Sequence, residues 1–215
     1  MQYPKHAIIS CAGLGSRLGL NIPKCLVDIG GKKMLERQLN LLKNIKDIRI
    51  VVGFKEMEVI NFAKSIRKDI TFVRNPNYAT TSNSYSIYLA TNNLKEPHII
   101  IDGDLIIEKS TFNNFLKQCG NKNLVGVTKT KTEDAVFVKT DNNLIIESFS
   151  RTEKDKYEWC GIAYLYDIKI PKDQGYVFKE LEKKLPLQAI NIQCFEVDTP
   201  IDLNNAIKSI NNNDY

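Results

Sequence analysis

The sequence predicts an α/β fold built around a mostly parallel sheet. Two observations predict it: short β-branched apolar runs alternate with amphipathic helical patterns, and this alternation repeats at the spacing of strand–helix units. Crossovers of this kind are right-handed and make consecutive strands parallel. Ligands of such sheets gather beyond the carboxyl ends of the strands. The expected strands are 7–9, 48–52, 70–73 and 98–101, and the expected helices are 33–43, 56–66 and 84–91.

Length, composition and charge favour one domain that binds anionic small molecules. The chain has 215 residues, 43% of them hydrophobic, and a net charge of +5. Basic residues are scattered singly, without a basic run interleaved with aromatics, so we expect no nucleic-acid partner. Apolar runs are strand-sized, and residues 1–5 lead into a strand rather than a signal peptide. We therefore expect a cytoplasmic protein without a membrane partner, either a monomer or a homodimer.

Cysteine and histidine usage narrows the chemistry. The five cysteines are odd in number and form no CxxC pair, which favours free thiols in a reducing compartment. With only His6 and His98 present, a His/Cys zinc site and histidine acid–base catalysis are improbable. Any metal would be held by carboxylates and would therefore be a hard cation.

The turn after the first strand is suited to phosphate. Residues 10–17 read SCAGLGSR, and Gly13 and Gly15 let backbone N–H groups approach an anionic ligand. Arg17 adds a planar cationic fork, and Lys24, after a proline, adds a second cation. A small-residue loop followed by two cations matches what a triphosphate needs.

Two better-known phosphate loops do not fit this turn. The Walker pattern requires Gly-Lys-Ser/Thr, which does not occur, and the dinucleotide fingerprint needs a third glycine where Leu18 stands. A plain βα turn with surface basic residues is the alternative for a GxG standing alone. The phosphate interpretation is favoured by Pro23-Lys24 followed by LVDIGGK at 26–32.

These motifs resemble the sugar-phosphate nucleotidyltransferase superfamily, whose pattern is a G-x-G-x-R loop, then P-K, then a short strand and a glycine-rich turn before a helix. Cys11 stands where that family usually has alanine. The resemblance implies a Rossmann-like three-layer α/β/α fold with a mostly parallel mixed central sheet and a small antiparallel β extension, the nucleotide-diphospho-sugar transferase fold. It also implies a single nucleotidyltransferase domain over residues 1–215. The implied nucleotide-binding residues of the loop are Ala12, Gly13, Leu14, Gly15 and Ser16.

A polar stretch at 74–84 precedes the helix expected at 84–91. It is too rich in side-chain donors and acceptors to be core, and a capping loop is the simplest interpretation. Within the superfamily this loop lies beside the base and the phosphates. Its Ser82-Asn83-Ser84 portion is similar to the phosphocholine and related small-molecule cytidylyltransferases, which implies that Ser82 and Asn83 contact the nucleotide.

Two acidic motifs follow strands. Asp102-Gly103-Asp104 ends the fully apolar strand at 98–101. Two carboxylates at the end of such a buried strand would be energetically costly without a cation. The alternative interpretation is a common turn rich in Asp and Gly. The strand expected at 191–197 ends in Glu196 and Asp198, two apart and therefore on one side; here a cap for the helix at 201–210 is the alternative. By resemblance, Asp104, Asp198 and Glu196 hold Mg²⁺ and Asp102 lies beside the nucleotide.

An antiparallel extension is expected over about 124–160. Its strands are 124–128, 135–139 and 144–150, the last two joined by a hairpin signal, and together they could wall an acceptor pocket. If the chain is already extended before a strand at 161–166, Tyr157 and Trp159 face one way and Glu158 the other; these three are the expected acceptor-binding residues. Trp159 beside a carboxylate could cage a cationic head group, although a lone tryptophan is more often core. A helix is expected at 176–184 and a frayed tail at 211–215.

Together the motifs indicate nucleotidyl transfer by positioning and charge neutralisation. Lys24 would act at the α-phosphate and Arg17 on the departing pyrophosphate. The resemblance implies CTP and a small phosphorylated acceptor: phosphocholine, 2-aminoethylphosphonate, or a phospho-amino acid such as phosphoglutamine, used in decorating surface polysaccharide. Three alternatives stay open: a sugar-1-phosphate nucleotidyltransferase, a glycosyltransferase using Asp102-Gly103-Asp104 as its D-x-D motif, and a non-catalytic nucleotide sensor.

Overall fold

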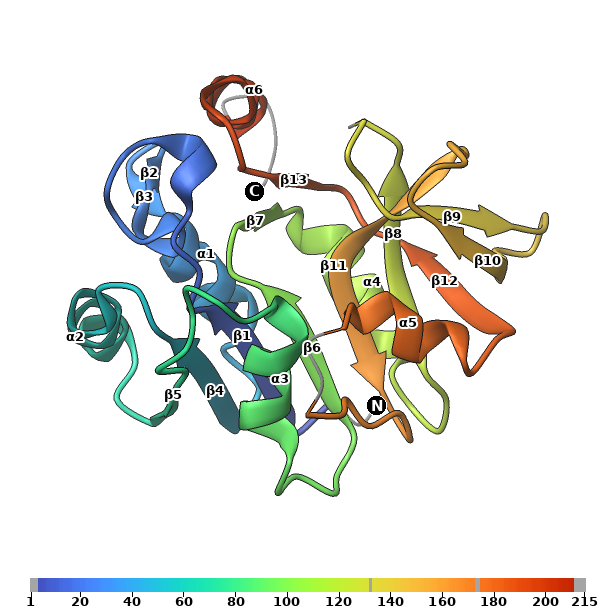
Figure 1. The fold of residues 1–215 in the computed structure, drawn as a ribbon, viewed down its shortest axis with the longest axis horizontal. Helices are drawn as coiled ribbons and strands as arrows, with labels where there is room; N and C mark the ends of the chain where they lie inside the picture. The colour runs from blue at the N-terminus through green and yellow to red at the C-terminus, as the bar shows by residue number, and fades with distance from the viewer. Residues whose placement is uncertain (1–3, 132, 173–174, 211–215) are drawn as a thin grey trace.

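The computed structural model describes residues 4–131, 133–172 and 175–210. One nine-stranded sheet runs through the molecule (Figure 1). From one edge to the other its strands are β5 (Ile70–Arg74), β4 (Asp47–Val52), β1 (His6–Cys11), β6 (His98–Asp102), β11 (Tyr157–Leu165), β8 (Leu124–Lys129), β12 (Leu187–Asn191), β10 (Ile145–Ser150) and β9 (Phe137–Thr140).

The sheet is parallel in its first half and mixed in its second. β5, β4, β1 and β6 run parallel, and this register places Ser10 of β1 beside Asp102 of β6. β11 is antiparallel to both β6 and β8, whereas β12 is parallel to β8. The expected extension is therefore continuous with the central sheet, and β12 lies within it although its residues come much later in the chain.

Helices cover both faces of the sheet, so the apolar strands are buried on both sides. Ala7 and Ile9 of β1 face one core, which α1 (Met34–Leu41), α2 (Glu56–Ile66) and α4 (Lys109–Gln118) complete. Ile8 faces the other core, which α3 (Asn83–Thr91) and α5 (Val177–Glu182) cover; these two helices lie in front of the sheet in Figure 1. The expected three-layer α/β/α arrangement is confirmed.

Strand β11 bends where it passes the end of β6. Its register against β8 shifts between Trp159 and Ala163, and Gly161 between them has φ +73°. The second half of β11 pairs with β6, whereas Tyr157 and Glu158 in the first half pair with β9. The bend therefore separates the first half of β11 from the carboxyl end of β6.

Two small sheets and a last helix complete the fold. β7 (Leu105–Ile107) pairs with β13 (Cys194–Glu196), and β2 (Asp28–Ile29) pairs with β3 (Lys32–Lys33). The terminal helix α6 (Pro200–Ile210) packs through Ala206 onto a third core cluster. The first loop belongs to that cluster through Leu18, in the 3₁₀ turn Ser16–Leu18, and a second 3₁₀ turn, Lys24–Leu26, follows it.

The strand expected at 191–197 is present only as the shorter β13 at 194–196, and β12 at 187–191 was not expected. The chain leaves the main sheet after Asn191, and Gln193 offers its carbonyl to the N–H of Glu108 instead of to a strand. β12 and β13 consequently belong to different sheets, which the apolar content of the run does not reveal. The expected fraying of 211–215 lies outside the described residues. None of the helices in the described ranges has the length and apolar character needed to cross a bilayer.

Candidate active site

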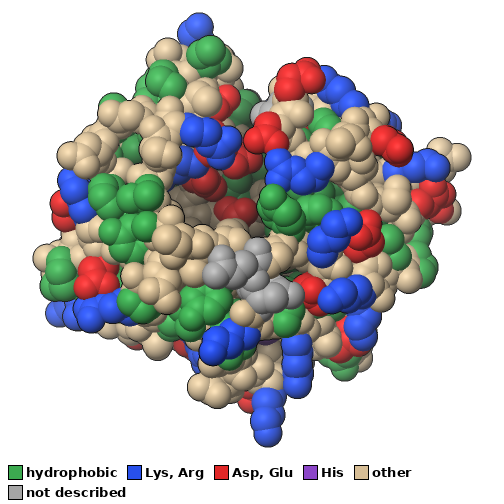
Figure 2. All heavy atoms as spheres, in the orientation of Figure 1, with side chains coloured by type: hydrophobic (Ala, Val, Ile, Leu, Met, Phe, Trp, Pro, Cys, Tyr) green, Lys and Arg blue, Asp and Glu red, His purple; other side chains and the backbone are tan. Residues whose placement is uncertain are grey.

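A hollow opens where the carboxyl ends of β1 and β6 meet the start of α3. Figure 2 shows acidic side chains on its floor and basic side chains at its rim. The smaller of its two cavities has a volume of about 280 Å³. Its walls include Ala12, Gly13 and Gly15 of the first loop, Ser82 and Asn83 at the start of α3, and Asp102.

The first loop is shaped by Gly15. Its φ is +61°, and a Cβ there would lie 2.8 Å from Cγ of Lys24, so a glycine lets the loop pack against the lysine stem. At Gly13 a Cβ would meet nothing within 4 Å, which leaves that backbone open to a ligand. Leu14 is 43% exposed, and neither it nor Ser16 lines the cavity. The loop thus presents Ala12, Gly13 and Gly15 to this cavity.

A hydrogen-bonded chain joins β1, α3 and β6. The Ser10 hydroxyl donates to Asn83 Oδ1, and Asn83 Nδ2 donates to Asp102 Oδ1 at 2.6 Å. Ser82 caps α3 by accepting the N–H of Tyr85. Burial, together with the nearby charge of Asp104, raises the pKa of Asp102 to about 7. This chain fixes the orientation of the Asp102 carboxylate at the cavity wall.

The acidic bend is anchored closely to its neighbours. The N–H of Gly103 donates to the Ser10 carbonyl at 3.0 Å, and a Cβ on Gly103 would lie 2.5 Å from that oxygen. The N–H of Val197 donates to the Asp104 carbonyl at 3.0 Å. The hydrogen bond from Val197 holds the late acidic motif, 196–198, beside the early acidic motif, 102–104, although the two motifs are more than ninety residues apart.

Three carboxylates and two cations converge at this point. One oxygen each of Asp104, Glu196 and Asp198 lies within 4.8 Å of the others. Lys24 Nζ is 2.7 Å from Asp104 Oδ2 and also bonds Asp198, whose second oxygen is 2.6 Å from the Arg17 guanidinium. Burial alone would lower the pKa of Lys24. The carboxylates of Asp104 and Asp198 outweigh this effect, so the pKa of Lys24 is raised. Although burial acts in the opposite direction, Lys24 and Arg17 lower the pKa of Asp198.

The carboxylate cluster fits a hard divalent cation. Asp104 Oδ1 is buried and has no hydrogen-bond partner among the described residues, so its lone pairs are available. Desolvation within the site and the carboxylates of Asp104 and Asp198 raise the pKa of Glu196 to about 9, because a further negative charge is disfavoured there. Carboxylate oxygens are the ligands that Mg²⁺ prefers. Asp104, Glu196 and Asp198 are therefore the residues that could hold it.

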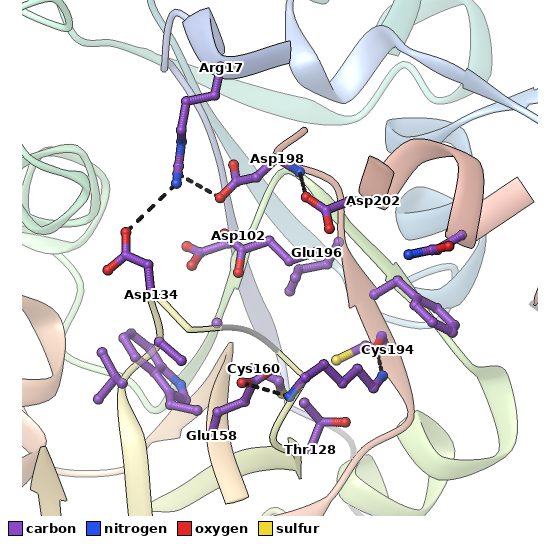
Figure 3. A pocket seen from close by; sticks show the side chains of 18 of the residues that line it. Arg17, Asp102, Thr128, Asp134, Glu158, Cys160, Cys194, Glu196, Asp198 and Asp202 are labelled. Atoms are coloured by element: carbon purple, nitrogen blue, oxygen red, sulfur yellow. Dashed lines mark hydrogen bonds and ion pairs between the residues drawn. The ribbon is translucent and has the colours of Figure 1, made fainter. Parts of the chain in front are cut away.

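The larger cavity, about 690 Å³, lies between the first half of β11, β13 and α6. Asp102 and Glu196 line both cavities, so the two meet at the acidic floor. Figure 3 shows Arg17 reaching over this cavity toward Asp198 and Asp134; the distance from its guanidinium to Asp134 is 3.9 Å. A molecule in the larger cavity therefore faces the carboxylate cluster and Arg17.

Only two of the three expected acceptor-binding residues reach the larger cavity. Glu158 and Trp159 line the larger cavity, whereas Tyr157 packs against the core and is not one of the lining residues. Trp159 Nε1 donates to the Ile162 carbonyl at 3.1 Å across the bend in β11, so the indole is held at a fixed angle. Glu158 is 7% exposed and accepts the N–H of Lys131. Trp159 thus combines contact with the core and contact with the cavity.

Sequence reasoning missed four residues of this region. Asp134, Lys131 and Arg151 line the larger cavity, but each lies in or beside a charged loop that reads as a solvated surface. Gln38 of α1 donates to the carbonyls of Asp102 and Leu105, which flank the acidic bend. Its signal was present: it is a polar residue three positions after Leu35 on the inward face of the helix.

The family described as "MobA-like NTP transferase domain" matches residues 7–160. The "Bifunctional protein GlmU" of Methanococcus aeolicus is 27% identical over 213 residues, 97% of this chain and 50% of that protein. The "Choline-phosphate cytidylyltransferase" of Streptococcus pneumoniae is 38% identical over 115 residues, 51% of this chain and 49% of that protein. The "CMP-5'-(3-aminopropyl)phosphonate synthase" of Streptomyces rubellomurinus is 32% identical over 112 residues, 49% of this chain and 18% of that protein. The chain thus spans about half the length, or less, of these curated relatives.

Solved structures share the fold. The inositol-1-phosphate CTP transferase from T. maritima has a TM-score of 0.77 at 17% identity, covering 98% of both chains. The CTP:phosphocholine cytidylyltransferase from Streptococcus pneumoniae has a TM-score of 0.78 at 23% identity, covering 96% of this chain and 99% of that one. The expected nucleotidyltransferase fold and the resemblance to this superfamily are confirmed.

Proposed function

Because the chain belongs to the MobA-like NTP transferase domain family, we propose that it transfers CMP from CTP to a small phosphorylated acceptor and releases pyrophosphate. The observation that carries the proposal is the convergence of Lys24 and Arg17 with the carboxylate cluster where two cavities meet. The smaller cavity would take the nucleotide and the larger one the acceptor. Single-domain organisation over residues 1–215, a cytoplasmic location and a role in decorating surface polysaccharide belong to the same proposal.

The chemistry needs no general base. An oxygen of the acceptor phosphate or phosphonate attacks the α-phosphorus of CTP in line, the new P–O bond forms, and the bond to pyrophosphate breaks. The attacking oxygen is already an anion, which agrees with a site that contains no histidine among its described lining residues. Positioning and charge stabilisation then account for the rate.

Lys24 and Arg17 supply the positive charge. Lys24 is held by Asp104 and Asp198 at the junction of the cavities. It also lines the smaller cavity, so a change of side-chain rotamer would bring it to a nucleotide bound there. It would stabilise the charge that develops at the α-phosphate. Arg17 is paired with Asp198 of the carboxylate cluster and would turn from it to stabilise the departing pyrophosphate. Until a nucleotide binds, Asp198 holds both cations beside the carboxylate cluster.

The nucleotide would be held by the remaining loop and helix residues. Backbone groups of Ala12, Gly13 and Gly15 would approach its phosphates and ribose, and Ser82 and Asn83 its base. Asp104, Asp198 and Glu196 would hold Mg²⁺, which when bound neutralises the negative charge of the phosphates. Asp102, held by Asn83, would face the ribose at the junction of the cavities.

The acceptor would extend from the junction toward β11. Glu158 and Trp159 on the cavity wall would suit an amine-bearing acceptor, through charge and cation–π contact. Phosphocholine, an aminoalkylphosphonate and a phospho-amino acid such as phosphoglutamine share this chemistry. The similarity to a choline-phosphate cytidylyltransferase and a CMP-aminopropylphosphonate synthase supports an acceptor of this class.

A second candidate is a sugar-1-phosphate nucleotidyltransferase. It is favoured by the similarity to GlmU, which extends over 97% of this chain. A glycosyltransferase would use the acidic bend but has no need of Arg17 and Lys24 at the junction. A non-catalytic sensor tends to lose acidic ligands, and here both acidic motifs are present and in contact.

A pyrophosphate-release assay tests the proposal. Each of the four nucleoside triphosphates is combined with phosphocholine, 2-aminoethylphosphonate, phosphoglutamine and glucose-1-phosphate, with Mg²⁺ present. We expect release with CTP and one of the first three acceptors. Release with glucose-1-phosphate favours the second candidate, hydrolysis of a nucleotide sugar favours a glycosyltransferase, and nucleotide binding without turnover favours a sensor.

A further inference from the structure

Gln38 is a buried polar residue on an otherwise apolar helix face. It lies on α1 between Leu35 and Leu39, and all three side chains are at most 2% exposed. Burying a side-chain amide is costly unless its polar atoms are hydrogen-bonded. Gln38 Oε1 is buried without a hydrogen-bond partner among the described residues, so the amide NH₂ group makes the contacts that an aliphatic residue could not make.

Those contacts bracket the acidic bend. Gln38 Nε2 donates to the carbonyl of Asp102 at 2.9 Å and to the carbonyl of Leu105 at 3.0 Å. Both partners are acceptors only, so the amide nitrogen must face the bend. Gly103 and Asp104 are the two residues between these carbonyls. One planar amide thus links the 102–103 peptide group to the 105–106 peptide group, which are the two ends of the short segment that contains Asp104.

Backbone groups supply two further anchors of the bend. The N–H of Gly103 ties it to β1, and the Asp104 carbonyl accepts the N–H of Val197 in the late acidic motif. Gln38 adds a link to a third element, the helix α1. Groups that orient a metal-binding carboxylate commonly affect metal affinity as strongly as some ligands do.

We propose that Gln38 is a positioning residue that places the Asp104 carboxylate for the divalent cation of the nucleotide complex. It acts through the carbonyls of Asp102 and Leu105 and touches neither the nucleotide nor the acceptor. The inference rests on the proposed function for the identity of the cation complex. Its test does not depend on turnover.

The test is a Mn²⁺ titration at fixed CTP concentration, with and without the protein, followed by the electron paramagnetic resonance signal of free Mn²⁺. The loss of signal beyond that caused by CTP alone measures binding to the protein. The wild type is compared with Gln38→Met, which keeps the side-chain length and removes both donors. Asn40→Met, at an exposed position of the same helix, is the matched control. We expect Gln38→Met to weaken Mn²⁺ binding about tenfold or more, and Asn40→Met to stay within about twofold of the wild type. Turnover of Gln38→Met should recover as Mg²⁺ is raised, which a general loss of folding would not allow.

Thermal unfolding shows whether each variant is folded. Should Gln38→Met not fold, Gln38→Asn replaces it, since its shorter amide cannot reach both carbonyls, and the same weakening is expected. Unchanged Mn²⁺ affinity in the folded variant overturns the positioning role. A wild type that binds no Mn²⁺ with CTP overturns that role together with the metal site. A wild type that binds Mn²⁺ but releases no pyrophosphate contradicts the proposed function alone.

Discussion

The carboxylate of Asp102 lies directly against Gly161. A Cβ on Gly161 would be 2.6 Å from Asp102 Oδ2, and Gly161 has φ +73° at the bend of β11. The course of β11 and the placement of Asp102 thus depend on one residue without a side chain. Because Asp102 lines both cavities, this contact lies at their junction.

Gly161→Ala should reduce both stability and turnover. A left-handed backbone costs about 1–2 kcal/mol for a residue with a Cβ, and the added methyl would push Asp102 aside. We expect a lower melting temperature and a loss of about tenfold or more in pyrophosphate release. Gly120→Ala is the control, because its Cβ would have no neighbour closer than 4.0 Å. Equal behaviour of the two variants would show that Asp102 does not need this contact.

Lys24→Ala should lower turnover by about a hundredfold or more, as the loss of one preorganised charge does. The ammonium group of Lys24 contacts both Asp104 and Asp198, so its removal also leaves their charges facing each other. Steady-state kinetics of pyrophosphate release measures the effect. Lys32→Ala, at an exposed position outside both cavities, should stay within about twofold of the wild type. Near-normal turnover of Lys24→Ala would refute its assignment.

Removal of divalent metal should abolish pyrophosphate release. Three carboxylates meet within 4.8 Å, and a triphosphate would bring further negative charge to the same place. Dialysis against EDTA should therefore stop the reaction, and added Mg²⁺ should restore it. Activity that persists in EDTA would contradict the role given to Asp104, Glu196 and Asp198.

Trp159→Leu should raise the KM for the acceptor about tenfold and leave the KM for CTP within about twofold. Trp159 lines the larger cavity and not the smaller one, so its effects should be confined to the acceptor. Tyr157→Phe is the control, because Tyr157 does not line the larger cavity. Parallel changes in both KM values would indicate a packing defect in β11; thermal unfolding of both variants distinguishes that outcome.

Local patterns were sufficient to predict much of the fold and the separate motifs. The apolar run before Gly13 and the carboxylates at 102, 104, 196 and 198 are short-range signals, readable from composition and spacing. The parallel half of the sheet follows from alternating strands and helices, because right-handed crossovers permit few other arrangements. These parts of the structure are encoded in local patterns and in the order of the elements along the chain.

The remainder depends on pairings between distant segments. Gln38 meets the acidic bend 64 residues later, and the bend in β11 arises because its two halves pair with different strands. Arg17 reaches Asp134, which lies in a charged loop with no local sign of function. The short length of the last expected strand depends on its pairing with β7, an element that periodicity did not identify. The local sequence around either partner alone does not indicate such a contact.

The central claim is that Asp104 and Asp198 hold one cation together. The most direct measurement is the turnover of Asp104→Asn, Asp198→Asn and the double variant under the same saturating conditions. If both carboxylates serve one ion, each single change should cost about a hundredfold or more, and the double variant should be about as slow as the slower single one. A double variant whose loss equals the product of the two single losses would mean that the carboxylates act independently, and would contradict the account.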